Sequence, residues 1–362
     1  MNHNIVTIAD HEQAANHCMS EAAWAYFSGG AADEITLRQN ISAWQSWGLA
    51  PRVLRNLQGG HTRVHLLGQE YAVPVLVAPM AYQRWAHHHG ESGMAMAAAA
   101  QGCGMVLSHQ TSTPLHDVAE SFLEDHDHGP LWFQMYWQPD RGHTQSLMSD
   151  IEDAGYQAIA LTVDAPVHGV RDRERRHGMP LPDGVHAAHW PAPSATNGVG
   201  LCGGLANLAP TWDDVYWLAS QTHLPVLLKG ITHPQDGRLA MQLGCQGIVV
   251  SNHGGRVLDT VPATADLLPL VVSSVRAEHP NASILVDGGI RRGSDVFKAL
   301  ALGADAVMVG RPVLFGFAHA GARGAAHVLR LLRDELETTM TLCGCRTLQD
   351  IHSDHLTSCP TK

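Results

Sequence analysis

The sequence predicts a (β/α)8 (TIM) barrel, and three observations support that prediction. Short apolar runs recur eight times, each run ends in polar or glycine-rich residues, and each is followed by a segment with helical periodicity. Successive runs mostly begin about 20 to 35 residues apart, which is enough for a strand, a loop and a helix. A doubly wound sheet is the alternative, but no G-x-G-x-x-G motif follows the first run.

The apolar runs give the expected strands, and the periodic segments between them give the helices that right-handed crossovers need. The eight strands are predicted to begin at Ala72, Gly104, Leu131, Ala158, Pro225, Gly247, Ser283 and Ala306. The helices are predicted at residues 90–102, 115–125, 144–155, 212–222, 234–244, 265–279 and 293–303.

We expect a single domain over residues 1–362. Residues 1–70 are mainly helical and then irregular, as expected of a cap or plug on the barrel, which itself covers 71–330. Residues 331–362 are predicted to form a C-terminal helix and tail. The long insertion at 174–210, rich in Pro, Gly and His, follows the fourth strand and is predicted to be a lid over the active site.

Composition excludes several classes of function. The net charge of -11 and the lack of a long basic run argue against a nucleic-acid partner. Seven scattered cysteines without a C-x-x-C pair favour reduced thiols in a cytoplasmic protein over a disulfide framework. No signal peptide and no long apolar span are evident, so we expect no membrane attachment.

The triplet His87, His88 and His89 is the one obvious group of metal-ligating residue types. Three adjacent positions cannot all face one point on a regular helix or strand. We therefore expect a surface cluster here, and no metal site.

Polar residues follow the predicted strands, and in such a barrel these strand ends converge on one face. Any one of them has an ordinary structural explanation, such as a helix cap or a turn. Together they would concentrate unpaired polarity in one place unless a ligand used it. The residues are Pro79, Met80, Ala81, Ser108, Gln134, Tyr136, Thr162, Asp164, Lys229, Ser251, His253, Arg256, Asp287, Gly288, Gly289, Gly310 and Arg311.

The last two strand ends are the most specific part of this pattern. "DGGIRRG" and "GRP" combine glycines with Arg291, Arg292 and Arg311, which suits a phosphate group held by backbone N–H groups at helix starts. Lys229, after the fifth strand, would face the middle of such a ligand. There a fixed positive charge would stabilise an anionic ring system.

Four stretches, "SNHGGRVLD", "LTVDAP", "LLKGI" and "DGGIRRGSDVFKALALGADAVMVGRP", resemble the family of FMN-dependent L-2-hydroxy acid oxidases and dehydrogenases. That family includes glycolate oxidase, lactate oxidase and mandelate dehydrogenase. The resemblance extends from "AYFSGGAADEITLRQN" at 25–40 to "RDELETTMTLCGCRTLQDI" at 333–351. It implies a homotetramer that binds FMN across the barrel mouth.

The resemblance also assigns residues to the flavin. Those along the isoalloxazine would be Pro79, Met80, Ala81, Ser108, Gln134 and Thr162. Lys229 and Ser251 would meet its pyrimidine edge and ribityl chain. The ribityl and phosphate groups would be held by Asp287, Gly288, Gly289, Arg291, Gly310 and Arg311.

The family's substrate residues match Tyr26, Tyr136, Arg171, His253 and Arg256. The resemblance implies that the two arginines bind the substrate carboxylate, with Tyr26 as a neutral donor. His253 would be the base, and Tyr136 would hydrogen-bond the substrate oxygen. Asp164 would orient His253 and stabilise its imidazolium form.

The family pattern leaves substrate and acceptor open. Glycolate oxidases carry tryptophan where this chain has Gln110, so we expect a roomier or more polar pocket, shaped also by Tyr82 and the lid. We expect an oxidase that passes electrons to O2 and releases H2O2, with a lactate- or mandelate-type substrate. Three other activities stay open: a quinone- or cytochrome-coupled dehydrogenase, a monooxygenase, and a non-oxidising FMN or phosphate-binding barrel. The mechanism also stays open between hydride transfer and a carbanion.

Overall fold

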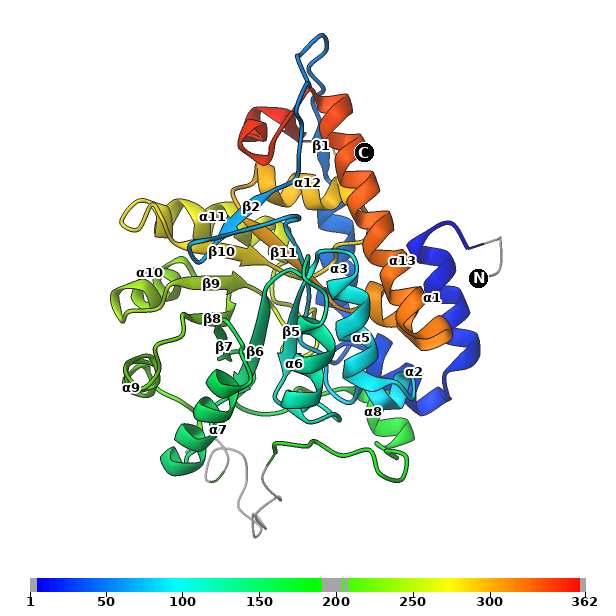
Figure 1. The fold of residues 1–362 in the computed structure, drawn as a ribbon, viewed down its shortest axis with the longest axis vertical. Helices are drawn as coiled ribbons and strands as arrows, with labels where there is room; N and C mark the ends of the chain where they lie inside the picture. Colours follow the sequence, from blue (N-terminus) through cyan, green and yellow to red (C-terminus); the bar gives the residue numbers. More distant parts are fainter. Residues whose placement is uncertain (1–4, 191–203, 205–207, 359–362) are drawn as a thin grey trace.

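The computed structural model describes residues 5–190, 204 and 208–358. Eight parallel strands close into a barrel in the order β10-β11-β4-β5-β6-β7-β8-β9, so the predicted (β/α)8 fold is confirmed (Figure 1). The barrel strands are β4 (Val75–Val77), β5 (Gly104–Ser108), β6 (Leu131–Tyr136), β7 (Ile159–Thr162), β8 (Val226–Ile231), β9 (Gly247–Val250), β10 (Ser283–Val286) and β11 (Ala306–Val309).

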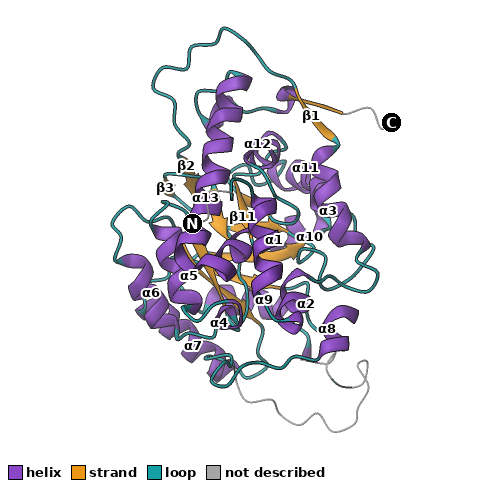
Figure 2. Ribbon diagram, turned by 90° about the vertical axis from the view of Figure 1, so that its right-hand side faces the viewer, coloured by secondary structure: helices purple, strands orange, loops and turns teal. Residues whose placement is uncertain are grey.

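Helices surround these strands on the outside (Figure 2). Helices at all seven predicted positions are present, and an eighth follows the last strand. They are α5 (Gly90–Ala99), α6 (Leu115–Leu123), α7 (Arg141–Asp153), α9 (Trp212–Ser220), α10 (Pro234–Gln242), α11 (Thr264–Arg276), α12 (Gly293–Ala301) and α13 (Arg311–Cys343).

The strands are apolar throughout because both of their faces are buried. Alternate residues point inward, and Leu76, Val106 and Trp132 belong to one buried cluster in the barrel interior. Their neighbours along the strands, such as Val77 and Leu107, belong to a second cluster that includes the inner faces of the helices. This two-sided burial makes the strand ends a rigid frame for the polar residues that follow them.

The N-terminal segment begins with α1 (Ile8–Cys18), α2 (Glu21–Ser28) and α3 (Ile35–Gln45). The part expected to be irregular contains β1 (Trp47–Leu49), which pairs with β12 (Leu356–Ser358), and a hairpin of β2 (Val64–Leu66) and β3 (Gln69–Tyr71). Strands of three residues are too short to show a period in the sequence, so these were not predicted. The inward side chains of the hairpin join the cluster in the barrel interior and close its amino-terminal end.

Helix α13 is the longest element, with 33 residues, and is kinked at Ala320 and Gly321. The part after the kink includes the C-terminal helix expected from residue 331, and α1 packs against α13 on both sides of the kink, where His11 contacts His319 and His327 (Figure 1). Two short 3-10 helices, Leu348–Asp350 and Ser353–His355, lead to β12.

Two short helices, α4 (Gln83–Ala86) and α8 (Asp172–His177), follow β4 and β7 at the carboxyl ends of the strands. Of the predicted lid at 174–210, residues 191–203 and 205–207 lie outside the described residues. No helix in the described part of the chain is both long and apolar enough to span a membrane.

Candidate active site

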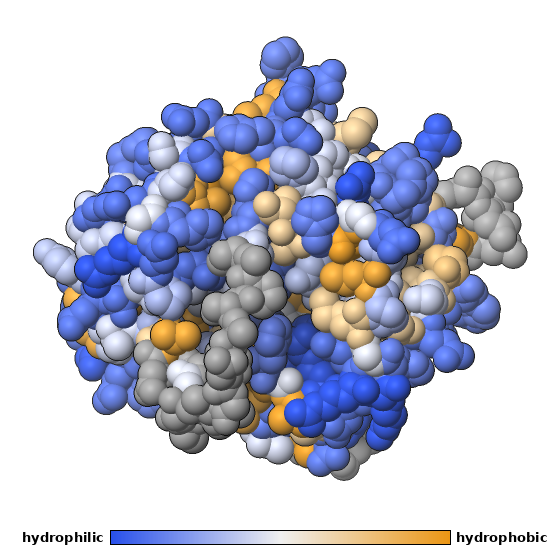
Figure 3. All heavy atoms as spheres, turned by 90° about the horizontal axis from the view of Figure 1, so that it is seen from below, coloured by the Kyte–Doolittle hydropathy of each residue, from blue (hydrophilic) through white to orange (hydrophobic). Residues whose placement is uncertain are grey.

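A cavity of about 700 Å³ opens at the carboxyl ends of the barrel strands. Residues after all eight strands line it, together with residues of α2, α3 and the described part of the lid. Figure 3 views the molecule from the side that carries α8, and this face is mainly hydrophilic with smaller hydrophobic areas. The cavity is large enough for a cofactor and a small acid together.

The structure brings nearly all the predicted site residues together around this cavity. Asp164, Ser251 and Arg292 do not line it. Asp164 and Ser251 lie directly behind residues that do, whereas Arg292 is exposed and forms an ion pair with Glu335, so the phosphate role expected for it is not supported. The predicted residues that line it are Tyr26, Pro79, Met80, Ala81, Tyr82, Ser108, Gln110, Gln134, Tyr136, Thr162, Arg171, Lys229, His253, Arg256, Asp287, Gly288, Gly289, Arg291, Gly310 and Arg311.

His253 is held by a carboxylate. Its Nδ1 lies 2.9 Å from Oδ1 of Asp164, which is itself mostly buried. Burial raises the pKa of Asp164, but the charge and hydrogen bond of His253, with the charge of Lys229, lower it further, so the net pKa is below the usual value. An ionised Asp164 accepts the Nδ1 proton, which leaves Nε2 of His253 as the proton acceptor.

The loop after β9 places His253 through an unusual backbone. His253, Gly254 and Gly255 have φ values of 57°, 62° and 74°. All three are in the left-handed backbone conformation, which residues with a side chain rarely adopt. A Cβ atom at Gly255 would lie 2.6 Å from the backbone nitrogen of Leu37. The glycine therefore lets α3 approach the loop, and the backbone N–H of His253 donates to Oγ of Ser251 at 3.0 Å.

A reciprocal amide pair fixes the same loop from the other side. The side chains of Asn40 and Asn252 exchange two hydrogen bonds of 2.8 and 2.9 Å, and both residues are buried. Oδ1 of Asn40 also accepts from the backbone N–H of Thr264. Helix α3 thus ties the loop after β9 to α11, and neither asparagine belonged to the predicted site.

Two partly buried arginines converge on the carboxyl end of α2. Arg256 donates through Nη1 to the carbonyls of Tyr26 at 2.6 Å and Gly29 at 3.0 Å, and its guanidinium lies 5.1 Å from the Tyr26 ring centre. Arg311 donates to the carbonyls of Phe27, Gly29 and Gly254. In the described structure neither arginine has a carboxylate within ion-pair distance, so both carry positive charge toward the cavity.

The pKa values of these two arginines reflect the lack of a carboxylate partner. Burial, and then the charge of Arg171, lowers the pKa of Arg256 to about 10. Burial and the neighbouring arginines Arg256, Arg291 and Arg173 likewise lower the pKa of Arg311. An anion entering the cavity would relieve this repulsion, which makes the site selective for negatively charged ligands.

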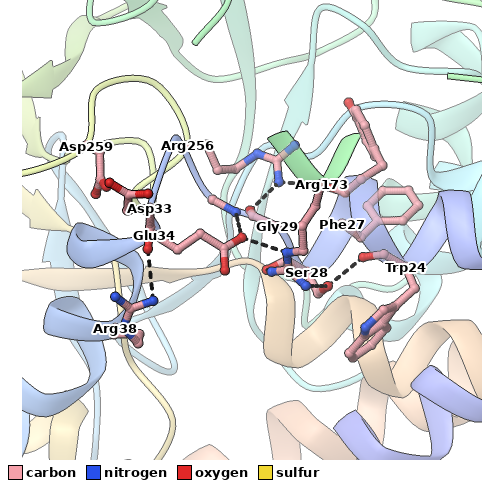
Figure 4. A network of polar contacts seen from close by, with 12 residues as sticks. Trp24, Phe27, Ser28, Gly29, Asp33, Glu34, Arg38, Arg173, Arg256 and Asp259 are labelled. Carbon is pink, nitrogen blue, oxygen red and sulfur yellow. Dashed lines mark hydrogen bonds and ion pairs between the residues drawn. The ribbon is translucent and has the colours of Figure 1, made fainter. Parts of the chain in front are cut away.

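A third arginine supports this arrangement from outside. Nε of Arg173 lies 2.7 Å from Glu34, and its two other nitrogens donate to the hydroxyl and carbonyl of Ser28 (Figure 4). Glu34 also accepts the backbone N–H of Gly30 at 2.8 Å. The network joins α8 to the end of α2. No motif in the sequence predicts these contacts.

Arg171 is already paired. Its Nη1 lies 3.0 Å from Oε2 of Glu174, one turn later in α8, and its Nε donates to the carbonyl of Arg256. Glu174 also lines the cavity. A substrate carboxylate bound by Arg171 would therefore share the guanidinium with Glu174.

Two phenols face the same region as neutral donors. Burial raises the pKa of Tyr26 to about 12, against the opposing effect of Arg256. Burial, followed by the charge of Asp164, also raises the pKa of Tyr136. Both hydroxyls stay protonated at physiological pH and can donate to a bound oxygen.

Several buried polar atoms around the cavity lack a partner among the described residues. They are Nε2 of Gln134, Oγ1 of Thr162 and Oδ1 of Asp287; Nη1 of Arg291 makes no hydrogen bond either, but lies 3.5 Å from a carboxylate oxygen of Glu12. Each belongs to a residue that the family resemblance assigns to the flavin. Because a buried polar atom left unpaired costs about 1–3 kcal/mol, these atoms fit a polar ligand such as FMN.

Lys229 lies between Asp287 and Ser251 at the cavity wall. Its Nζ lies 3.2 Å from Oδ2 of Asp287 and donates to Oγ of Ser251 at 3.1 Å, with all three residues buried. Burial lowers the pKa of Lys229, but the charges of Asp287 and Asp164 outweigh it, so the net pKa is raised. The lysine is therefore a permanent cation at the cavity wall, as a flavin ring that accumulates negative charge requires.

Many cavity residues were missed from the sequence, and three of them carry rings or charges close to the predicted site. His168 and Glu174 lie after β7, and Trp190 lies at the end of the described lid segment. The Trp190 ring centre is 4.9 Å from that of His109 and 5.8 Å from that of Tyr136. None follows a strand directly, so nothing in the sequence separated them from other loop residues.

The comparisons with known proteins agree with this geometry. A family model described as FMN-dependent dehydrogenase matches residues 15–358. The chain is 48% identical over 359 residues to an L-lactate oxidase of Roseobacter sp. (strain GAI101), covering 97% of this chain and 95% of that protein. It is 39% identical over 360 residues to glycolate oxidase 1 of Zea mays, covering 97% and 95%.

A crystal structure of mandelate oxidase with (S)-2-phenylpropionate superimposes with a TM-score of 0.88 at 37% identity, covering 98% of each chain. Together these matches confirm the resemblance drawn from the sequence motifs. The chain belongs to the family of FMN-dependent dehydrogenases.

Proposed function

We propose that this chain oxidises an (S)-2-hydroxy acid to the 2-oxo acid, with FMN as cofactor and O2 as the final electron acceptor. One observation carries the proposal: His253, paired through Nδ1 to Asp164, faces a cavity that also holds the uncompensated Arg256. A base beside an anion-binding group is what the oxidation of a hydroxy acid needs. The relatives named as lactate and glycolate oxidases support the same reaction.

Binding would begin with the substrate carboxylate. Arg256 and Arg171 line the cavity together with His253, and charge-assisted hydrogen bonds from them would hold the acid by this end. Tyr26, a protonated phenol stacked against Arg256, would add a neutral donor. The carboxylate thereby fixes the hydroxyl carbon near His253.

The proton would pass from the substrate hydroxyl to Nε2 of His253. Asp164 holds the opposite ring nitrogen and would stabilise the imidazolium that forms. Tyr136 would hydrogen-bond the substrate oxygen, since its hydroxyl stays protonated. FMN, when bound, would supply the acceptor for the carbon-bound hydrogen together with its electron pair, and loss of this hydride and of the hydroxyl proton leaves the 2-oxo acid.

The substrate's side chain would point toward Gln110, Tyr82 and Trp190. All three line the cavity, and the backbone N–H of Tyr82 donates to the carbonyl of Gln110 at 3.1 Å. This wall is part polar and part aromatic. We propose that it accepts a substrate from lactate to mandelate in size.

The proposal is tested by reducing the flavoprotein without oxygen. The purified protein is expected to carry oxidised FMN and to lose its yellow colour on addition of L-lactate or L-mandelate. Admission of air should restore the colour and produce H2O2. A protein that takes up no FMN would refute the proposal, and one reduced by substrate but reoxidised only by a quinone or cytochrome would refute the oxidase assignment.

A variant tests the assignment of the base. His253→Ala should retain FMN, because the cavity's flavin-side residues are untouched, and should lose most of its rate of reduction by substrate. The loss is expected to be at least about 10²-fold, measured as anaerobic bleaching in a stopped-flow instrument. Wild-type rates in this variant would exclude His253 as the base.

We also propose a single catalytic domain over residues 1–362, with the lid at 174–210 over the cavity. We further propose that the protein is a cytoplasmic homotetramer. These proposals rest on the family resemblance and on the lack of C-x-x-C pairs in the sequence. Light scattering of the FMN-loaded protein would measure the assembly directly, and a monomeric mass would contradict it.

A further inference from the structure

The histidine triplet 87–89 lies between α4 and α5, outside any regular element. His87 has extended backbone angles (φ -158°, ψ 140°), whereas His89 is in the right-handed helical region (φ -70°, ψ -14°). The change of direction brings the three side chains together, so that one ligand nitrogen from each lies within 4.8 Å of the others. The sequence argument applied to a regular helix or strand, and the triplet lies in neither, so its three side chains can face one point.

One member of the triplet, His87, is held in place by packing against α13. The His87 ring packs against Phe317, with ring centres 5.1 Å apart, and lies beside Gly321 in the kink of α13. A Cβ atom at Gly321 would be 3.0 Å from Cε1 and 3.2 Å from Nε2 of His87. The kink with its glycine therefore leaves room for this imidazole and limits its movement.

The other two histidines are exposed and less constrained. His88 and His89 have ring centres 4.4 and 4.9 Å from that of His87, and 4.2 Å from each other. The only hydrogen bond to a triplet ring nitrogen in the described structure is a long one, 3.3 Å, from the backbone N–H of His89 to Nδ1 of His87. Rotation of the two exposed rings is enough to point all three toward one ion.

The charge balance also suits a metal. No carboxylate of the described residues forms an ion pair with these histidines, in contrast to His253 and its partner Asp164. Among the described residues, no ion pair therefore competes with a metal for these three imidazoles.

We propose that His87, His88 and His89 bind one divalent transition-metal ion of the kind that prefers imidazole, such as Zn²⁺ or Co²⁺. Three nitrogen ligands with an open fourth position for water match a known zinc geometry, in which each Zn–N distance is about 2.0–2.1 Å. The site is separate from the flavin cavity, whose lining includes none of the three histidines. The ion would join the end of α4 to the start of α5.

The test is a Co²⁺ titration of the FMN-loaded enzyme after removal of metals with a chelator. Co²⁺ bound by three imidazoles should give visible absorption at wavelengths beyond the flavin bands, saturating at one ion per chain, and Zn²⁺ should abolish it by displacement. The affinity should also fall as pH is lowered from about 8 to about 6, because protons compete for the ligands.

A matched pair of variants locates the site. His88→Gln/His89→Gln should lower the Co²⁺ affinity at least about tenfold, and FMN content should report that the fold is intact. His65→Gln/His126→Gln removes two histidines that are equally exposed but outside the triplet, and should bind Co²⁺ as the wild type does. Absence of saturable binding, or equal loss in both variants, would overturn the proposal.

Discussion

His253 differs from the other buried histidines of this protein in its neighbours. Burial and nearby histidines lower the pKa of His11 to about 4, and burial lowers the pKa of His109 to about 3. Neither ring is hydrogen-bonded to a carboxylate among the described residues. His253 alone of these three lies 2.9 Å from an ionised aspartate, so its surroundings accept the positive charge that proton abstraction creates.

Replacing that aspartate tests the pairing. Asp164→Asn keeps the shape of the side chain but removes the negative charge behind His253. We expect the rate of anaerobic flavin reduction to fall roughly 10²-fold, about 2.7 kcal/mol in activation free energy. Stopped-flow measurement at saturating substrate gives the value.

Asp213→Asn provides the control, because Asp213 is exposed on α9. In this variant the substrate should reduce the flavin at the wild-type rate. If the flavin of Asp164→Asn is also reduced at the wild-type rate, the carboxylate has no part in proton transfer.

At the scale of elements, the loop after β9 depends on the close approach of α3. Gly255→Ala would place a Cβ atom 2.6 Å from the backbone of Leu37 at a φ of +74°. We expect a loss of roughly 3 kcal/mol in the free energy of unfolding, since both strain and a backbone clash contribute. Chemical denaturation of the FMN-free protein measures it.

Gly59→Ala separates the two contributions. Gly59 has a similar φ of +76°, but nothing lies within 4 Å of the added Cβ atom. Its loss should be about 1 kcal/mol, the conformational part alone. Equal losses for the two variants would mean that contact with α3 does not constrain the loop.

The packing of α1 on α13 contains a row of three histidines. Nδ1 of His11 lies 2.7 Å from His319, and its Nε2 lies 2.9 Å from His327. Because the pKa of His11 is lowered to about 4 in the folded state, the unfolded chain binds an extra proton between about pH 6.5 and 4. Folding stability should therefore fall as pH falls through this window.

His11→Gln should reduce that loss by about 1–2 kcal/mol, after allowing for solvent screening. Unfolding free energies measured at several pH values would give the slope. His17→Gln, an exposed position on the same helix, should leave the slope unchanged. A variant at His11 with the wild-type slope would show that this residue does not carry the effect.

At the scale of the whole molecule, the chain has a net charge of -11 but gathers partly buried arginines around one cavity. FMN brings the phosphate that these arginines lack, so it should bind the folded state and not the unfolded one. At an FMN concentration of about 100 times Kd, folding should gain about 2.7 kcal/mol.

Thermal unfolding of the protein with and without FMN measures this gain. Arg291→Gln should weaken it, because Arg291 lines the cavity and its Nη1 has no hydrogen bond among the described residues, only an ion pair of 3.5 Å with Glu12. Riboflavin, which has no phosphate, serves as the control ligand. If riboflavin stabilises the protein as much as FMN does, the phosphate is not held by these groups.

The sequence by itself determined the barrel and the polar residues at the ends of its strands. Eight apolar runs fix eight buried strands, and the polar residues at their ends must converge because parallel strands in a closed barrel share one carboxyl face. This is why Lys229, His253 and Arg311 could be assigned together without a structure. The family resemblance added Tyr26 and Arg171, which follow no strand.

Only the tertiary structure decided which charged side chains have a partner of opposite charge and which do not. It paired Arg171 with Glu174, left Arg256 without a carboxylate, and placed Trp190 against Tyr136. It also brought one ring nitrogen from each of His87, His88 and His89 within 4.8 Å of the others, where the sequence predicted only a surface cluster. These outcomes depend on distances between segments far apart in the chain or on irregular backbone, and neither leaves a periodic signal in the sequence.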